Sequence, residues 1–162
     1  MLKVSRVIAV ALVAAGLSSV ASAQKFDNRR LFFGGGFAQN SVSNFDNATG
    51  FQIFGGYNFP ELARKFSVDA EAGYMDTGNF KRTAPTVENK AKGVWGSGVA
   101  RYMVAPQVEL LGRLGYDFGD DDGVMYGIGA GYIVSKNLKL RLEYVVRDSV
   151  DSLQFNVVFY PW

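Results

Sequence analysis

The 162-residue sequence contains neither histidine nor cysteine, two residue types that commonly carry acid–base and nucleophilic chemistry. Histidine is the most frequent general base for a serine or water nucleophile, and both residues supply the softer metal ligands. A hydrolytic centre of the usual kind cannot be built from this composition. We therefore expect a protein that is not an enzyme, with no catalytic residue, no metal site and no cofactor.

Three glycines at alternate positions, Gly127, Gly129 and Gly131, raise the question of a phosphate-binding loop. A dinucleotide-binding fingerprint requires G-x-G-x-x-G between a buried strand and a helix, with an acidic residue further on. Here the spacing is G-x-G-x-G, and the following segment alternates like another strand. We predict that the glycines share one face of a strand, where they leave room for long side chains from the opposite wall.

Two polar segments could bind ions or surfaces. YDFGDDDG, residues 116–123, offers oxygen ligands for Ca²⁺, but it lacks the spacing and the distal glutamate of a calcium loop, so a polar hairpin is the simpler interpretation. The segment 77–92 is basic, and its cations could pair with lipopolysaccharide phosphates or an anionic host surface. The alternative is a solvated, mobile loop without a specific partner. The basic residues are Lys81, Arg82, Lys90 and Lys92.

The elements that must position these residues are strands, because period-two alternation recurs in eight blocks of about ten residues. Gly, Asn, Asp, Pro and Ser separate the blocks. They cover residues 29–39, 49–58, 66–76, 92–104, 107–117, 123–134, 138–148 and 152–160. In 138–148 the leucines share one face, while Lys139, Arg141 and Glu143 share the other. The block 92–104 fits least well, because an inward Arg101 turns Gly96 and Gly98 outward, so a bulge or the opposite phase is an alternative.

Charged side chains of both signs occur on the polar faces of these blocks, where they can pair. They are Asp69, Glu71, Glu109 and Glu143 with Arg101, Arg113, Lys139 and Arg141. An arginine at the lipid midplane costs about 2–4 kcal/mol, so in a membrane these residues must face inward. The interior of an eight-stranded barrel is just wide enough for side chains to fill. We predict a lumen plugged by paired charges, with little or no conductance.

The length of the blocks favours a membrane. Ten residues at about 3.3 Å each, tilted about 45°, span roughly 23 Å, close to the apolar band of about 25 Å in outer-membrane barrels. Aromatic residues near the block ends resemble interfacial girdles. They are Tyr57, Phe59, Tyr74, Tyr102, Tyr116, Tyr132, Tyr144, Phe159 and Tyr160. Short and long connections alternate, which predicts periplasmic termini. The fold class expected is all-β: an eight-stranded, antiparallel, up-and-down transmembrane barrel.

The first residues predict export. Lys3 and Arg6 precede an apolar run at 7–17 and an A-S-A site at 21–23, as in a cleavable signal peptide. We expect residues 1–23 to be the signal peptide and 24–162 to be one barrel domain. Cleavage removes two of 17 basic residues and no acidic one, which leaves 15 of each sign. The neutral mature chain gives no reason to expect a nucleic-acid partner.

Two stretches carry a family resemblance. GIGAGYIVSKNLKLRLEYVVRD resembles the sixth-to-seventh strand region of OmpA-type transmembrane barrels. LQFNVVFYPW resembles a C-terminal assembly signal, with Tyr160, Pro161 and Trp162 overhanging the alternation. Similarity to the small barrels of the OmpA and OmpX/Ail type implies an outer-membrane location, contact with lipid and lipopolysaccharide, and folding by the barrel assembly machinery. It also implies a role in envelope integrity, adhesion or immune evasion.

The sequence thus predicts a monomeric outer-membrane barrel with a structural or surface-interaction role and an unidentified host or surface ligand. Two alternatives stay open. The first is a narrow, porin-like channel of low conductance. The second is a soluble periplasmic barrel whose apolar face points inward around an apolar ligand.

Overall fold

The computed structural model describes residues 27–42, 47–83, 86–89, 91–120 and 122–161. The expected signal peptide, 1–23, lies outside these residues. Among the described residues, no helical segment has the length and apolar character needed to cross a membrane.

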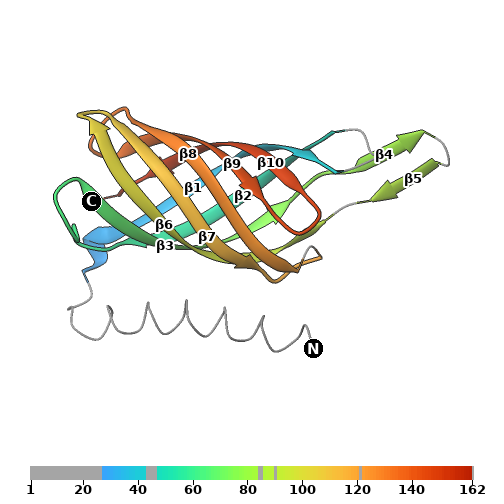
Figure 1. Cartoon of the computed structure of the whole chain (residues 1–162), viewed down its shortest axis with the longest axis horizontal. Helices are drawn as coiled ribbons and strands as arrows, with labels where there is room; N and C mark the ends of the chain where they lie inside the picture. The colour runs from blue at the N-terminus through green and yellow to red at the C-terminus, as the bar shows by residue number, and fades with distance from the viewer. Residues whose placement is uncertain (1–26, 43–46, 84–85, 90, 121, 162) are drawn as a thin grey trace.

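Over the described residues, eight antiparallel strands close into one barrel in the order β1-β2-β3-β6-β7-β8-β9-β10, with β10 paired to β1 (Figure 1). A two-stranded hairpin, β4–β5, extends from one end. The elements are a short 3₁₀ turn η1 (Asn28–Arg30), β1 (Leu31–Ser41), β2 (Ala48–Asn58), β3 (Phe66–Asp76), β4 (Phe80–Thr83), β5 (Thr86–Asn89), β6 (Lys92–Ala105), β7 (Val108–Asp117), β8 (Gly123–Ile133), β9 (Leu138–Val146) and β10 (Asp151–Phe159). The predicted fold class is confirmed, and each barrel strand begins and ends within two residues of its predicted block.

The apolar faces of the strands point outward. On β9, Leu142 and Tyr144 are 52% and 46% exposed, whereas the intervening Glu143 is 1% exposed. The same alternation holds along β10, where Phe155 is exposed and Asn156 is buried. A soluble barrel needs the opposite arrangement, so the alternative of an apolar ligand cavity is wrong.

Strand β6, whose inward-facing side was uncertain from the sequence, has Arg101 on its inward face. Trp95, Val99 and Arg101 are buried, and Gly96 and Gly98 are therefore on the outer face. The register with β7 shifts between Met103 and Ala105, after the charged position. The irregularity at the strand end leaves Arg101 facing inward.

The two ends of the barrel differ. The turns at 59–65, 106–107 and 134–137 lie at the end where β1 begins and β10 finishes, and the longest connection, 77–91, lies at the other end (Figure 1). The segment 77–91, expected to be an irregular loop, contains the hairpin β4–β5. Its base is closed by Thr77 and Ala91, which exchange hydrogen bonds of 2.9 and 3.0 Å through the threonine hydroxyl. Phe80 is buried against Ala48 and Val150, so the hairpin is anchored on the barrel mouth.

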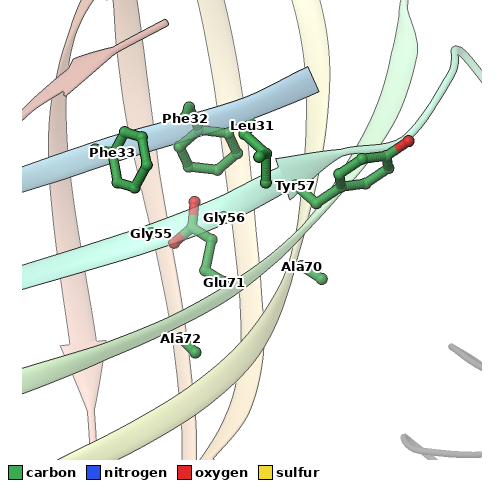
Figure 2. Close-up of a pocket in the computed structure, with 9 residues that line it drawn as sticks. All are labelled: Leu31, Phe32, Phe33, Gly55, Gly56, Tyr57, Ala70, Glu71 and Ala72. Atoms are coloured by element: carbon green, nitrogen blue, oxygen red, sulfur yellow. The ribbon is translucent and has the colours of Figure 1, made fainter. Parts of the chain in front are cut away.

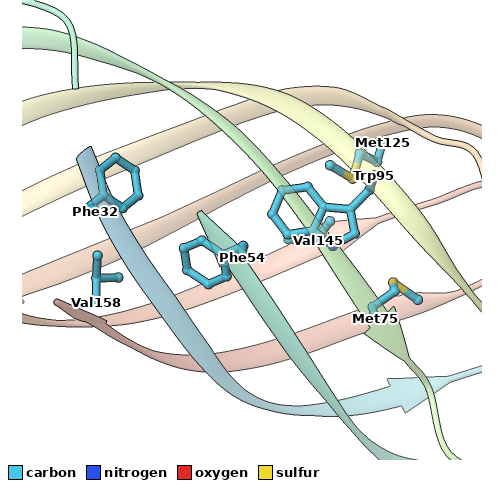
Figure 3. Packing of buried hydrophobic residues seen from close by; sticks show 7 residues of the cluster. All are labelled: Phe32, Phe54, Met75, Trp95, Met125, Val145 and Val158. Carbon is cyan, nitrogen blue, oxygen red and sulfur yellow. The ribbon is translucent and has the colours of Figure 1, made fainter. Parts of the chain in front are cut away.

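A hydrophobic cluster with three aromatic members occupies part of the interior (Figure 3). Phe54 and Trp95 lie with their ring centroids 5.9 Å apart. A Cβ atom at Gly73 would lie 2.8 Å from Cζ2 of Trp95, so an inward-facing glycine provides the space for the indole. The cluster consists of Phe32, Phe54, Met75, Trp95, Met125, Val145 and Val158.

Candidate functional site

The part of the lumen nearer the chain termini contains a cluster of ion pairs around Arg101. Its guanidinium contacts both oxygens of Asp69, at 2.8 and 3.0 Å, and also Oε2 of Glu109 at 3.0 Å. The Lys139 ammonium lies 3.2 Å from the same Glu109 oxygen. These side chains come from β3, β6, β7 and β9, so the contacts join the neighbouring strands β3, β6 and β7 and reach past β8 to β9. A guanidinium that contacts two carboxylates fixes the geometry of both.

A second cluster surrounds Arg113 on β7. The guanidinium donates to both carboxylate oxygens of Glu143, at 2.9 and 3.1 Å, and lies 2.9 Å from Oε2 of Glu71. It also donates to the Ser97 hydroxyl at 2.8 Å. Arg113 therefore has charge-assisted partners on three other strands.

Arg141 joins the two clusters. Its guanidinium lies 3.2 Å from Asp69 and also donates to Glu71, and its side chain is completely buried. The eight residues predicted to line the lumen thus form one continuous network. Four carboxylates meet four cations, so the net charge of the network is zero. Charges this deeply buried persist only when paired and hydrogen-bonded.

The glycines of β8 explain how the network fits. A Cβ atom at Gly131 would lie 2.7 Å from Cγ and 2.8 Å from Oε1 of Glu109. A Cβ atom at Gly129 would lie 2.8 Å from Cγ of Glu143. As the alternating spacing predicted, these glycines face inward and admit the long acidic side chains of neighbouring strands.

Aromatic rings lie against the cations of the network. The Arg113 guanidinium lies 5.2 Å from the Trp95 ring centroid, and Nζ of Lys139 lies 5.0 Å from that of Tyr160. At these distances a ring attracts a cation through its quadrupole. Arg141 has the same relation to Phe32, at 5.6 Å.

Tyr160 was counted with the interfacial aromatics, and for this residue the prediction is wrong. Its ring packs 5.1 Å from the buried ring of Phe32, on the luminal side. The backbone N–H of Tyr160 donates to the Asn137 carbonyl at 2.8 Å, and the Asn137 amide donates back to the Tyr160 carbonyl at 2.6 Å. These two bonds turn the chain inward directly after β10, so the tyrosine covers the end of the lumen.

Sequence reasoning missed a polar cluster nearer the other end. Arg147 contacts Asp117 at 3.2 Å and donates to the Ser152 hydroxyl at 2.9 Å. Ser152 in turn donates to the side-chain oxygen of Asn40 at 2.6 Å. Asp117 and Arg147 lie at the ends of their alternating blocks with the inward phase. That signal was in the sequence, although the pairing across the barrel was not.

The acidic segment 116–123 forms a turn, as the simpler interpretation of its sequence predicted. Asp117 and Asp120 accept backbone N–H groups of Gly119 and Lys92, at 3.0 and 3.1 Å, and so shape a turn. Asp121 lies outside the described residues. Within the part of the chain that the structure describes, no group of three or more acidic side chains could hold a metal ion.

The basic segment is only partly described. Lys81 and Arg82 belong to β4, with Lys81 opposite Glu88 in the backbone register. Lys92 is exposed at the beginning of β6. Lys90 lies outside the described residues.

Comparison with known proteins identifies the fold and the family. Residues 8–158 match the model of the outer membrane protein beta-barrel domain. A structure from de novo design of transmembrane beta-barrels has a TM-score of 0.54 and 20% identity, covering 84% of this chain and 98% of that one. The outer membrane protein Ail of Yersinia pestis, in a phospholipid bilayer nanodisc, has a TM-score of 0.53 and 17% identity, covering 80% and 98%. The attachment invasion locus protein Ail, in complex with the heparin analogue sucrose octasulfate, has a TM-score of 0.52 and 15% identity, covering 80% and 95%. No curated protein matches the sequence.

Proposed function

The chain belongs to the outer membrane protein beta-barrel family, whose members are transmembrane proteins of the outer membrane. We propose that this barrel has a plugged lumen and acts through its surface. Its role is structural, in envelope integrity or adhesion, and it is not an enzyme. Residues 1–23 direct export and are removed, the termini are periplasmic, and the barrel assembly machinery inserts the monomer through its C-terminal strand.

The observation that supports this proposal is the neutral, buried network in the lumen. Eight charged side chains from four strands pair with one another, and aromatic rings cover them. An open diffusion pore needs a wide aqueous passage, which larger barrels provide. With the interior occupied in this way, interactions at the extracellular end remain the main way to act on other molecules.

Single-channel recording tests the plug. The purified, refolded protein in planar bilayers should show little or no conductance under symmetric salt. Steady, large currents would contradict the plug, whereas steady, small currents would favour the narrow-channel alternative. A variant with Arg113→Ala and Glu143→Ala removes one pair and serves as the comparison, because it should raise the frequency of small openings.

The hairpin β4–β5 is the proposed contact surface. It projects beyond the barrel wall (Figure 1), and its segment carries Lys81, Arg82, Lys90 and Lys92 against Glu88. Clustered cations attract sulfated or phosphorylated polymers and lipopolysaccharide. The similar protein Ail was solved with a sulfated heparin analogue, which supports testing this class of ligand first.

A binding assay separates this surface from general charge effects. Replacing Lys81, Arg82, Lys90 and Lys92 with glutamine should weaken heparin binding at least tenfold. Raised salt should likewise weaken heparin binding by the wild-type protein, because it screens the charges. The control replaces Arg64, Lys65 and Lys136, at the opposite end, and should leave binding unchanged. Unchanged binding by the hairpin variant would overturn the assignment of the ligand surface.

A further inference from the structure

The outer face of the barrel is hollowed where β1, β2 and β3 leave the end that carries the chain termini. The groove has a volume of about 360 Å³ (Figure 2). Outward-facing residues of the three strands line it, and they alternate with Phe32, Gly56 and Glu71, which face the lumen. Its lining consists of Leu31, Phe32, Phe33, Gly55, Gly56, Tyr57, Ala70, Glu71 and Ala72.

The hollow is not required by the packing of the wall. A Cβ atom at Gly55 would meet its nearest neighbour, a ring carbon of Phe33, at 3.5 Å, which is an ordinary van der Waals contact. Gly56 differs, because its missing side chain makes room for the inward ring of Phe32. Small residues at Gly55, Ala70 and Ala72 therefore lower the outer surface beside the prominent ring of Phe33, without relieving a clash inside.

A second groove of about 400 Å³ follows the first along β1 and β2 and borders β10. Its lining consists of Gly35, Gly36, Phe37, Phe51, Gln52, Ile53, Phe155 and Val157. From Leu31 to Phe37 a tilted strand rises about 15 Å. That is the depth of one leaflet of a hydrocarbon core about 30 Å thick. The two grooves together have the length and the apolar lining that an extended acyl chain requires.

Basic residues gather where the first groove reaches the rim. Arg29 and Arg30 directly precede Leu31, and their side chains are 79% and 34% exposed. The backbone N–H of Asp27 donates to the Tyr57 hydroxyl at 3.3 Å, which ties this segment to the groove wall. Hydrogen bonds from the Arg29 backbone and side chain lower the pKa of Asp27, so its carboxylate is charged at neutral pH.

The neighbouring turn between β2 and β3 adds further positive charge. It carries Arg64 and Lys65, both exposed, against Glu61. Taken together with the segment at 27–30, four bases face two acids, for a net charge of +2 at this part of the rim.

We propose that the first groove binds an acyl chain of an anionic glycerophospholipid, with the lipid phosphate against Arg29 and Arg30. Charge complementarity at the rim selects the headgroup, and the apolar grooves hold the chain at the depth of one leaflet. Tyr57, half-buried between the two regions, marks the boundary between headgroup and hydrocarbon. This lipid site lies at the opposite end from the hairpin and is independent of the surface role proposed above.

Native mass spectrometry of the refolded barrel in detergent tests the site. We expect phosphatidylglycerol to be retained about five- to tenfold more tightly than phosphatidylethanolamine, because a basic side chain near an anionic lipid contributes about fivefold and Asp27 offsets part of it. Arg29→Gln with Arg30→Gln should bring the ratio close to one. Lys136→Gln, at the same rim on the β8–β9 turn, is the matched charge control and should preserve it.

Filling the groove tests the acyl part separately. Gly55→Leu and Ala72→Leu should each reduce retention of both lipids at least threefold, whereas Ala130→Leu, an exposed small residue of β8, should not. Heat-modifiable gel migration identifies variants that have folded. The site would be overturned by equal affinity for the two lipids, by a preference that survives the arginine substitutions, or by equal effects of Ala130→Leu and the groove variants. Tighter retention of lipid A than of phosphatidylglycerol, lost with the same arginines, would also refute the choice of a glycerophospholipid.

Discussion

Replacing Arg113 with methionine removes the cation that holds Glu143 while keeping most of the side-chain volume. The guanidinium contacts Glu143 at 2.8 Å and Glu71 at 2.9 Å, and it is 6% exposed. Glu71 keeps Arg141 as a partner, so the main effect falls on Glu143. Breaking a buried pair by removing one partner costs about 3–5 kcal/mol, because a buried charge is left without compensation. We expect Arg113→Met to lower the free energy of unfolding by about that amount.

The second half of this prediction is a rescue. Adding Glu143→Leu to Arg113→Met removes the uncompensated carboxylate, and an apolar replacement for a buried pair is often neutral or stabilising. The double variant should therefore recover at least about 2 kcal/mol of the loss, as a favourable coupling in a double-mutant cycle.

Urea unfolding in lipid vesicles measures the free energy of unfolding of each variant in the double-mutant cycle. Tryptophan fluorescence follows unfolding, and gel migration provides a second probe because Trp95 lies beside the mutated residue. Arg64→Met, on the exposed turn, is the control and should change stability by less than about 0.5 kcal/mol. A loss below about 1 kcal/mol for Arg113→Met, or a double variant no more stable than the single, would refute the view that the network is dry and tightly coupled.

Three further substitutions test other parts of the structure. Ile128→Arg places a cation on the exposed face of β8, and unfolding in vesicles should show a loss of about 2–4 kcal/mol, whereas a loss below about 1 kcal/mol would contradict a lipid-facing position. Gly131→Leu should destabilise the barrel because its Cβ displaces Glu109, while Gly112→Leu, with nothing within 4 Å of the added Cβ, should be tolerated, and equal effects would contradict the assigned faces. Phe80→Ala should cost about 3 kcal/mol and speed protease cleavage of the hairpin, since Phe80 is 1% exposed at the barrel mouth, and unchanged cleavage would show that the ring is not the anchor.

The strand pattern was predictable because a membrane barrel enforces a strict alternation. Lys139, Arg141 and Glu143 alternate with leucine and tyrosine, and a one-residue slip would place every charge in lipid. The same constraint settled β6, where the inward Arg101 outweighed the unusual pair of outward glycines. The burial of the eight charges follows from local periodicity, whereas the choice of partner for each does not.

What could not be predicted depends on geometry around the barrel. Which side chains meet depends on strand tilt and stagger, so contacts such as Arg141 with Asp69, 72 residues apart, have no signature in the sequence. Tyr160 was misassigned because an aromatic residue at a strand end has the same local pattern whether it faces lipid or the lumen. The hairpin at 80–89 was missed because four-residue strands are too short for alternation to be significant.

The order in which charge is matched has a consequence for how the molecule is assembled. Strands β3, β6 and β7 together contribute three acids and two bases, whereas β9 contributes two bases and one acid. A sheet that has reached only β7 therefore carries one surplus negative charge from the network, and a second from Asp117, on the side that will become the interior. Both are balanced only when β9 and Arg147, the residue after it, arrive. The closing edges, β1 and β10, contribute no charge to the ion-pair network described above. An incomplete cylinder is thus penalised electrostatically, and joining the two edges requires no further ions to be matched.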